Sequence, residues 1–127
     1  MLANLREATL LADSGKPAEA IAAFDAVAND GSAHRALREM ARLRAGLLLI
    51  DHGSYSDVAA RVEQLTAETN PVRHSAREIL ALSAWKEGNR DTALSLFNQI
   101  LDDGEAPAGV RQRAEMMSEL ISASGSD

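Results

Sequence analysis

The residues best suited to chemistry lie together in one stretch of this chain, NPVRHSARE at residues 70–78. On a helix, His74 and Glu78 point to one side because they are four residues apart, so they could supply two ligands to a metal ion. A zinc site needs a third or fourth ligand. The other histidines, His34 and His52, lie in or near different loops without a carboxylate motif of their own. The pattern therefore argues against a metal site.

The same stretch has a simpler interpretation as the start of a helix. Asn70 would cap the helix, Pro71 would be its first residue, and Glu78 would pair with His74 or with an arginine across one turn. Ser75 beside His74 suggests a nucleophile and its base, but adjacent helical residues point about 100° apart, so His74 is poorly placed to take that proton. The sequence contains neither a GxSxG elbow nor an oxyanion-hole loop. We predict no catalytic residues.

The rest of the sequence offers little further chemistry. No glycine-rich phosphate-binding motif is present. Asp102, Asp103 and Glu105 could hold a cation, but their spacing is not that of an EF-hand loop, and a helix end followed by a polar turn is the favoured interpretation. The chain has no cysteine, which removes disulfides and thiolate chemistry and leaves the compartment open. We expect neither a cofactor nor a small-molecule substrate.

The composition predicts the elements that must position these residues. Of the 127 residues, 46% are apolar, chiefly Ala and Leu, and only 3% are aromatic. Straight-chain and small side chains lose little rotamer freedom in a helix, so an all-α fold is expected. A chain of this length forms one domain with a continuous core.

The charge balance bears on the partners. A net charge of −6 repels a phosphate backbone on average. The nearest basic cluster consists of Arg35, Arg38, Arg42 and Arg44. Glu39 and apolar residues interrupt it, so a solvated helix face is favoured and no nucleic-acid partner is expected.

Membrane and targeting signals are weak in this sequence. The longest apolar run, from Gly46 to Ile50, is far shorter than a membrane span. The N-terminus, MLANLREA, lacks the basic region and the long apolar core of a signal peptide. At face value the chain is soluble, although it begins abruptly on a helical pattern and could be part of a longer protein.

Three segments share one layout, which predicts a repeat. They are LLADSGKPAEAIAAFDAV at 11–28, LLIDHGSYSDVAARVEQL at 48–65 and SAWKEGNRDTALSLFNQI at 83–100. In each, a Gly follows an apolar stretch, a small or branched residue comes five positions later, and a bulkier apolar residue follows after four more. Gly15, Gly53 and Gly88 recur at intervals of 38 and 35 residues.

Helical hairpins explain this layout. A Gly at the end of the first helix accepts the left-handed conformation, and Pro17 suits a first turn because it has no N–H to leave unpaired. The small residue lets the two helices approach, and a side chain such as Phe24 fills the gap between hairpins. The turn signals predict seven helices, at about 2–14, 17–29, 33–51, 55–68, 71–87, 90–103 and 107–122.

The predicted architecture is a right-handed α-solenoid in a single domain over residues 1–122. Its three hairpins lie at about 1–31, 33–69 and 71–105, and a capping helix follows at 107–122. The last helix carries an apolar stripe of Val110, Ala114, Met117 and Ile121, which would cover the open end of the array. Residues 123–127 are predicted to form a disordered tail.

The hairpins resemble the tetratricopeptide repeat of about 34 residues, which has small residues at its eighth and twentieth positions, Gly at the fifteenth and an aromatic residue at the twenty-fourth. The first unit fits with Ala8, Gly15, Ala20 and Phe24. The second offers Gly46, Gly53, Val58 and Val62, and the third offers Ala81, Gly88, Ala93 and Phe97. The usual Trp is missing from all three units, and the usual Pro has shifted to Pro71 and Pro107.

A narrower resemblance extends over the whole chain. The order KPAEAIAAFDAVAND, LREMARLRAGLLLIDHGSY, NPVRHSAREILALSAWKEGN and FNQILDDGEAPAGVRQRAEMM is similar to the periplasmic domain of the ancillary SecYEG translocon subunit family, in its α-proteobacterial form. NPxRHSARE and QILDDxEAPxGxRQRA are its most specific pieces. The resemblance implies a protein on the periplasmic side of the inner membrane, held by an N-terminal membrane helix that this chain lacks.

That resemblance also implies partners. They are the translocon and periplasmic chaperones such as a peptidyl-prolyl isomerase, and no catalytic residue is carried over. Without the resemblance, a soluble cytoplasmic protein is expected.

The repeat register predicts a concave, partner-binding groove. In such arrays the groove is lined by five positions of each first helix, which here select Met40, Leu43, Leu47, Ile50 and Asp51, and then Ser75, Glu78, Leu82, Trp85 and Lys86. Apolar side chains with charges at the rim suit an extended or helical peptide. Trp85 has a second interpretation, as core between the third hairpin and the last helix, and the sequence favours neither.

These observations lead to three functional hypotheses. The first is a non-catalytic protein–protein interaction scaffold near the translocon. The second is a self-associating structural domain, a homodimer through its N-terminal helices, without a translocon link. The third, an enzyme or metal protein that uses His74 and Glu78, is the least favoured.

Overall fold

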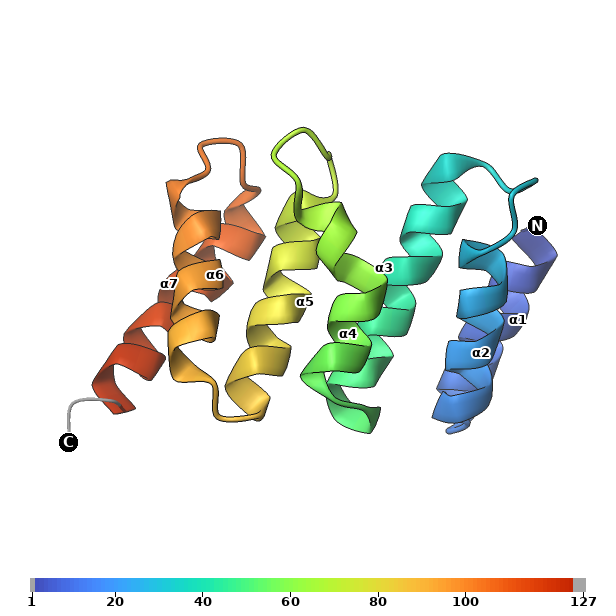
Figure 1. Ribbon diagram of the computed structural model, residues 1–127, viewed down its shortest axis with the longest axis horizontal. Coiled ribbons are helices and arrows are strands. Elements are labelled where there is room, and N and C mark those ends of the chain that lie inside the picture. The colour runs from blue at the N-terminus through green and yellow to red at the C-terminus, as the bar shows by residue number, and fades with distance from the viewer. Residues whose placement is uncertain (1, 125–127) are drawn as a thin grey trace. The chain divides into compact units, whose positions relative to one another are not determined.

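The structure, a computed structural model, describes residues 2–124, with side chains from Asn4 onward. This part of the chain forms seven α-helices and one short 3-10 helix (Figure 1). They are α1 (Leu2–Asp13), α2 (Pro17–Ala28), α3 (Arg35–His52), α4 (Tyr55–Val62), η1 (Glu63–Thr66), α5 (Arg73–Lys86), α6 (Arg90–Asp102) and α7 (Ala108–Ser124). The described residues contain no strand, so the predicted all-α helical-repeat fold is confirmed.

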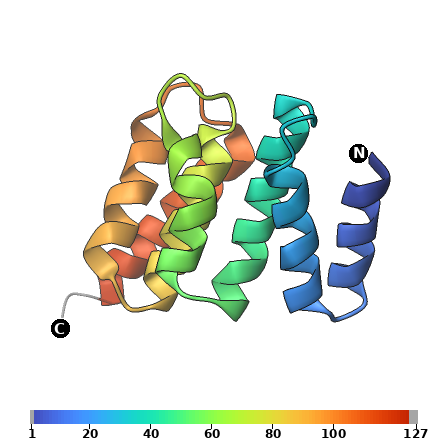
Figure 2. The same ribbon diagram turned by 45° about the vertical axis from the view of Figure 1, so that its right-hand side comes forward.

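The chain divides into two compact units, unit 1 at Met1–Val62 and unit 2 at Glu63–Asp127. Unit 1 contains α1 to α4, and unit 2 contains η1 and α5 to α7. Within each unit consecutive helices pack side by side, as α1 does with α2 and α5 with α6 (Figure 2). The prediction of a single domain over residues 1–122 stays a prediction.

The interior of unit 1 is built from residues that the repeat pattern selects. Ala8 on α1 and Ala20 on α2 are fully buried, and Phe24 belongs to the same apolar cluster. Val58 and Val62 are fully buried on α4. Because alanine carries only a methyl group, the helix axes can approach closely, and the aromatic ring takes up the remaining volume.

Unit 2 repeats this construction. The pattern residues Ala81, Ala93, Phe97 and Ile100 are fully buried. Helix α7 packs on α6 and also contacts α5. Its predicted apolar stripe points inward, with Val110, Ala114 and Ile121 buried and Met117 half-buried.

Two of the three hairpin glycines adopt the left-handed conformation that the sequence predicts. Gly15 has a φ of +75° and Gly88 a φ of +82°, and each follows a helix end. For Gly53 the prediction is wrong, because its φ is −157° with a ψ of −170°, an extended conformation open to any residue.

Gly53 is required for space instead. A Cβ at this position would lie 2.7 Å from Cδ2 of Leu49 and 2.9 Å from Oδ2 of Asp57. Asp57 is so close because it folds back to the start of α4. Its Oδ2 accepts the N–H of Ser54 at 3.0 Å, and Oγ of Ser54 accepts the N–H of Asp57 at 3.1 Å. This reciprocal cap starts α4 and leaves no room for a side chain at Gly53.

The predicted start of α5 at Asn70 and Pro71 is also wrong, by two residues. The helix begins at Arg73, and Asn70 accepts the N–H of Val72 through Oδ1 at 2.9 Å. An Asn side chain that bonds the backbone two residues ahead forms a turn, and Pro71 lies inside that turn. Asn70 therefore closes the loop before α5 and does not cap the helix.

Two other boundaries differ from the prediction. The helix expected at 55–68 ends as α4 at Val62 and continues as the tighter η1 to Thr66. Of the tail predicted at 123–127, Ala123 and Ser124 belong to α7, and residues 125–127 lie outside the described residues.

Candidate functional site

In unit 1, four of the five predicted groove residues form a partly exposed apolar face on α3. Met40 is 41% exposed and Leu47 is 55% exposed, while Leu43 and Ile50 are half-buried. The residues are spaced by three or four, so they share one side of the helix. We call Met40, Leu43, Leu47 and Ile50 the α3 stripe. Asp51, the fifth predicted groove residue, is exposed in the last turn of α3.

An apolar hollow of about 310 Å³ lies next to this stripe, between α1 and α3. It is lined by Leu5, Arg6, Thr9, Leu10 and Arg44, and we call it the α1–α3 hollow. Leu10 is 64% exposed, although its side chain is apolar. Oγ1 of Thr9 donates to the carbonyl oxygen of Leu5 at 3.0 Å, so its hydroxyl is satisfied within α1. Apolar contact is therefore the main interaction that this surface offers.

Two arginines give the hollow a positive rim. Arg6 and Arg44 are exposed, and neither enters an ion pair within the part of the chain that the structure describes. A guanidinium binds a carboxylate through two parallel hydrogen bonds. The hollow can thus hold an apolar side chain whose neighbours carry negative charge.

The sequence interpretation missed the α1 side of this surface. It applied the groove register to the second and third hairpins only. The same register in the first hairpin selects Leu5 and Thr9, both of which line the hollow. Arg6 and Leu10 are each one position further along the chain.

In unit 2, α5 carries the other predicted groove residues, and one of them is already occupied. Glu78 accepts two hydrogen bonds from Arg113 of α7, from Nε at 2.6 Å and from Nη2 at 3.0 Å. The bond to Glu78 raises the pKa of the Arg113 guanidinium. The expectation that Glu78 pairs with His74 or an arginine one turn away is therefore wrong: its partner is Arg113 on α7, 35 residues further along the chain.

The four other predicted groove residues on α5 differ from one another in polarity and exposure. Ser75 and Lys86 are exposed, whereas Leu82 and Trp85 are half-buried. Trp85 is thus neither fully enclosed core nor open surface, and both interpretations of it stay open.

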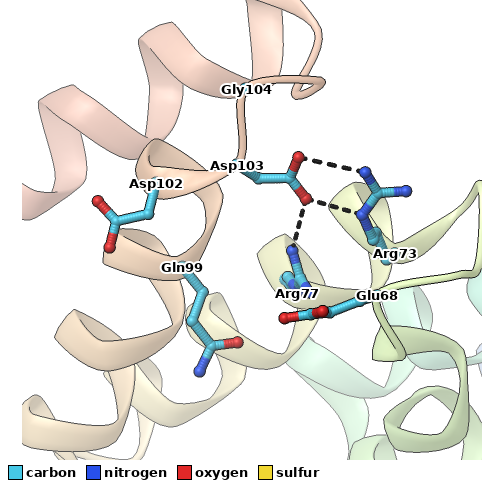
Figure 3. Close-up of a pocket in the computed structure, with 7 residues that line it drawn as sticks. All are labelled: Glu68, Arg73, Arg77, Gln99, Asp102, Asp103 and Gly104. Atoms are coloured by element: carbon cyan, nitrogen blue, oxygen red, sulfur yellow. Dashed lines mark hydrogen bonds and ion pairs between the residues drawn. The ribbon is translucent and has the colours of Figure 1, made fainter.

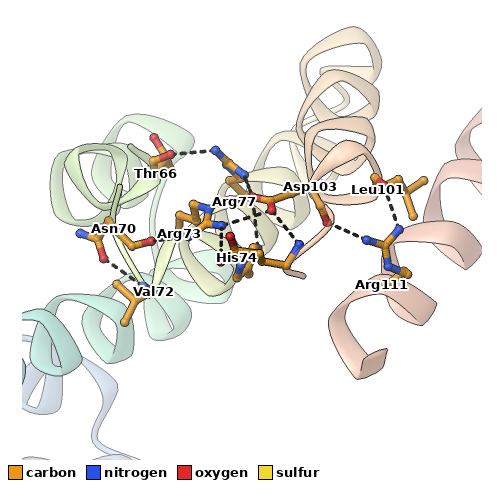
Figure 4. Close-up of polar contacts among 10 residues, drawn as sticks. Thr66, Asn70, Val72, Arg73, His74, Arg77, Leu101, Asp103 and Arg111 are labelled. Atoms are coloured by element: carbon orange, nitrogen blue, oxygen red, sulfur yellow. Dashed lines mark hydrogen bonds and ion pairs between the residues drawn. The ribbon is translucent and has the colours of Figure 1, made fainter. Parts of the chain in front are cut away.

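The NPVRHSARE stretch forms a buried ionic cluster, with Arg73 and Arg77 converging on one carboxylate (Figures 3 and 4). Asp103 accepts from Nε of Arg73 at 2.7 Å and from Nη1 of Arg77 at 3.0 Å. Nδ1 of His74 lies 3.8 Å from the same carboxylate and has no hydrogen-bond partner among the described residues. We call Arg73, His74, Arg77 and Asp103 the Asp103 cluster.

The cluster ties three segments of unit 2 together. Arg77 also donates to the carbonyl oxygen of Thr66 at the end of η1, at 3.2 Å. Arg111 of α7 donates to the carbonyl oxygens of Leu101 and Asp103 at 2.8 and 2.6 Å, so it caps the carboxyl end of α6 (Figure 4).

The charges in the cluster stabilise one another. The hydrogen bond from Arg73 is the main cause that holds the pKa of the Asp103 carboxyl far below its ordinary range, and the backbone N–H of Glu105 adds to it. In turn, Asp103 raises the pKa of Arg73. Asp103 therefore stays ionised as the counter-ion of two arginines and is poorly suited to exchange a proton with a substrate.

A polar cavity of about 430 Å³ borders the cluster (Figure 3). It is lined by Glu68, Arg73, Arg77, Gln99, Asp102, Asp103 and Gly104. Arg73 and Arg77 turn their donors to Asp103, which neutralises part of their charge. The cation site suggested for Asp102, Asp103 and Glu105 does not form, because both oxygens of Asp103 accept hydrogen bonds from arginine.

Neither the metal pair nor the nucleophile is assembled. Within residues 2–124, no group of three or more His, Asp or Glu residues is placed to hold a metal ion. Glu78 bonds Arg113, while His74 lies beside Asp103, so these two residues have different partners. Ser75 is exposed and His74 is buried.

The four arginines of α3 do not act as one basic patch. Arg35 pairs with Glu39 at 3.5 Å, and Arg44 lines the hollow. Arg38 and Arg42 are half-buried. The arrangement offers no continuous surface to a phosphate backbone.

Comparison with known proteins gives one positive result. The family model described as tetratricopeptide repeat matches residues 43–109, just over half of the chain. No match was found among curated proteins or among solved structures. Within the described residues, no helix is both long enough and apolar enough to cross a membrane.

Proposed function

This chain belongs to the tetratricopeptide-repeat family, and from that premise we propose that it is a protein-binding scaffold without catalytic activity. Tetratricopeptide repeats generally mediate protein–protein interactions and are typically non-catalytic. The buried pattern residues such as Ala20, Phe24, Ala93 and Phe97 serve packing. Partner binding therefore depends on surface residues that packing does not need.

The observation that carries the proposal is the exposed apolar surface of unit 1. Leu10, Met40 and Leu47 are among the most exposed large apolar side chains of the described chain. Leu10 lines a hollow whose rim carries Arg6 and Arg44, and Met40 and Leu47 lie one turn from Arg44 on α3. Apolar side chains in water are unfavourable, so a neighbouring group of them is typical of an interaction surface. A partner segment with apolar anchors and nearby carboxylates fits it.

The finer proposal places this scaffold beside the protein-export translocon on the periplasmic side of the inner membrane, where chaperones would be among its partners. It is supported by the sequence resemblance, whose two most specific segments are NPVRHSARE and QILDDGEAPAGVRQRA. These segments supply Arg73, Arg77, Asp103 and Arg111, which bond one another or the same loop. The resemblance thus rests on residues that close unit 2, so it supports a shared fold more strongly than a shared partner.

Photo-crosslinking tests the binding surface directly. A crosslinking amino acid at position 47 in the cell should capture a polypeptide, and Arg44→Glu or Leu47→Asp should reduce partner recovery in affinity purification. Ala22 is the matched control, because it is an exposed alanine on α2 outside the stripe and the hollow. Trp85→Ala asks whether α5 contributes. Equal crosslinking from positions 22 and 47, with equal recovery by all variants, would count against the proposal.

Location and partner need a separate test in the full gene product. A phosphatase that is active only outside the cytoplasm, fused to the C-terminus, should be active, and translocon subunits should co-purify with the protein. Activity confined to a cytoplasmic reporter would remove the translocon proposal and leave the scaffold proposal intact. A stoichiometric metal in the purified protein would instead favour the His74 and Glu78 hypothesis.

A further inference from the structure

Helix α7 has an outer face that packing leaves uncovered. Its inward residues, Val110, Ala114 and Ile121, are buried, and the opposite side presents Gln112, Glu115, Met116, Glu119 and Leu120 to solvent. Met116 is 61% exposed and Leu120 is 52% exposed. We call Glu115, Met116, Glu119 and Leu120 the α7 outer face.

The α7 outer face consists of two parallel rows of side chains, one acidic and one apolar. Glu115 and Glu119 are one turn apart and form an acidic row, and Met116 and Leu120, also one turn apart, form an apolar row beside it. Neither glutamate enters an ion pair in the part of the chain that the structure describes. The face therefore presents two apolar anchors with carboxylates alongside them.

The α1–α3 hollow has the matching arrangement with the opposite charge. On α1, Arg6 and Leu10 are one turn apart, and on α3 Arg44 is one turn from Met40. Arg6 thus lies beside the exposed Leu10 within the hollow, and Arg44 on the other wall lies one turn from the exposed Met40, which is outside the lining. The apolar row of α7 fits the hollow, and its acidic row fits the arginine rim.

We propose that copies of this chain associate head to tail, with the α7 outer face of one copy docked in the α1–α3 hollow of the next. Every copy carries one face and one hollow, so the contact joins two different surfaces and does not close on itself like a symmetric dimer. This goes beyond the proposed function, because it needs no foreign partner. Since both use the hollow, self-association and partner binding compete.

The strength of this contact follows from its size. One helix face in one hollow buries less area than a standard protein interface, so the association is weak, with a dissociation constant on the order of 100 μM. The exposed ion pairs at the rim are screened by salt, so the association weakens further as ionic strength rises.

Two single substitutions break opposite sides of the contact. We expect wild-type protein, measured by sedimentation equilibrium at low salt, to exceed its monomer mass of 13.5 kDa as the concentration rises. Leu10→Asp removes the hollow and Leu120→Asp removes the α7 outer face, so each variant stays monomeric. An equimolar mixture regains one intact contact and forms a discrete heterodimer. Ala22→Asp, the control, behaves like wild type, and circular dichroism checks that all variants keep their helices.

Charge reversal gives an independent test that does not depend on the apolar anchors. Changing both Arg6 and Arg44 to Glu should weaken association about tenfold, as should changing both Glu115 and Glu119 to Arg. Combining the four changes in one chain should restore the wild-type level, because the reversed rim meets the reversed row.

Several outcomes overturn the inference. One is a wild-type protein that stays monomeric at millimolar concentration. Another is a monomeric mixture of Leu10→Asp and Leu120→Asp. Association of Leu120→Asp alone at the wild-type level would favour pairing of N-terminal helices instead. Crosslinking of a foreign partner from position 47 is read separately, so either proposal can fail while the other stands.

Discussion

The two units share the same pattern of small and aromatic core residues but differ in how far their charged side chains are buried and paired. Unit 1 joins α2 to α4 with one ion pair, in which Arg61 contacts Asp25 at 2.9 Å and both side chains are 27% exposed. Unit 2 buries two arginines on Asp103, and the side chain of Arg77 is only 7% exposed. In unit 1, Arg6 and Arg44 at the hollow stay exposed to solvent. In unit 2, Arg73 and Arg77 instead bind the loop residue Asp103 and help to close the loops of that unit.

This difference separates packing from recognition. The small and aromatic residues that recur in both units build the same hairpin twice, so they carry no information about a partner. The residues that differ between the units decide which surface stays available. Reactive-looking side chains are concentrated in unit 2, yet the arginines that stay exposed beside an apolar hollow lie in unit 1.

The largest expected effect tests whether the two cores are equivalent. Phe24→Ala in unit 1 and Phe97→Ala in unit 2 should each lower the free energy of unfolding by about 3–5 kcal/mol, because both rings are buried and their removal leaves a cavity. Urea denaturation followed by circular dichroism measures both. A cost below about 1 kcal/mol for one ring would mean that its unit does not depend on the repeat core.

The second-largest expected effect tests whether the ion pairs of unit 2 stabilise the fold more than the ion pair of unit 1 does. Arg77→Met should cost about 2–3 kcal/mol, because the Asp103 carboxylate, whose side chain is only 15% exposed, loses one of its two cations, while Arg61→Met should cost about 1 kcal/mol or less. Methionine preserves much of the arginine volume, and each variant loses one hydrogen bond to a backbone carbonyl, that of Thr66 or that of Asp57, so the comparison reports mainly on the two ion pairs. Equal costs for the two variants would contradict the view that only unit 2 depends on its ion pairs.

The pH dependence sharpens the same contrast. The pKa of Asp103 in the folded chain lies below the ordinary 3.8, because Arg73 and the backbone N–H of Glu105 stabilise its charged form. As the pH falls through 3.8, the unfolded chain takes up the proton first, so the contribution is fully present at higher pH and is lost as the pH falls towards the folded pKa.

Asp103→Asn removes this contribution at every pH. Wild type should therefore be more stable than the variant above pH about 5, and the two unfolding curves should converge in acid. Asp91→Asn, at the exposed start of α6, is the control. A difference between wild type and Asp103→Asn that does not change with pH would show that the carboxylate acts through shape and not through charge.

The smallest expected effect distinguishes two reasons why a hairpin position requires glycine, namely a positive φ and a lack of space for a side chain. Gly15→Ala and Gly88→Ala should each cost about 1 kcal/mol, because their φ is positive and the space around them is open. Asn tolerates a positive φ, so Gly15→Asn should cost less than Gly15→Ala. At Gly53 the order should reverse, since the limit there is contact with Leu49 and Asp57. Thermal denaturation of these five variants, with Ala and Asn at both Gly15 and Gly53, checks both orders.

Much of the fold could be predicted from the sequence, because a helix satisfies its backbone hydrogen bonds within four residues and its pattern is local. Seven helices, their buried alanines and the left-handed Gly15 and Gly88 follow from spacing alone. The errors lie where local rules compete. Asn70 was interpreted as a helix cap, but the same side chain also favours a turn, and the turn formed.

The candidate site could be predicted only in part. The repeat register predicts that Met40 and Leu47 line a groove; both are exposed on α3, because position within a helix decides which way a side chain points, while their role in a groove stays a prediction. The register also selects Leu5 and Thr9 in the first hairpin, but the α1–α3 hollow that they line could not be predicted, because its volume depends on how two helices pack and not on either helix alone.

The sequence alone predicts an all-α repeat, its periods and its packing residues, and it contains no complete catalytic motif. The partners of the charged residues, in contrast, depend on how the helices pack. Arg73 and Asp103 are 30 residues apart, and Glu78 and Arg113 are 35 apart. Periodicity is a local property of the backbone, whereas an ion pair depends on distance in space, which the packing of helices sets. For that reason NPVRHSARE has the composition of an active site in the sequence and closes a loop in the structure.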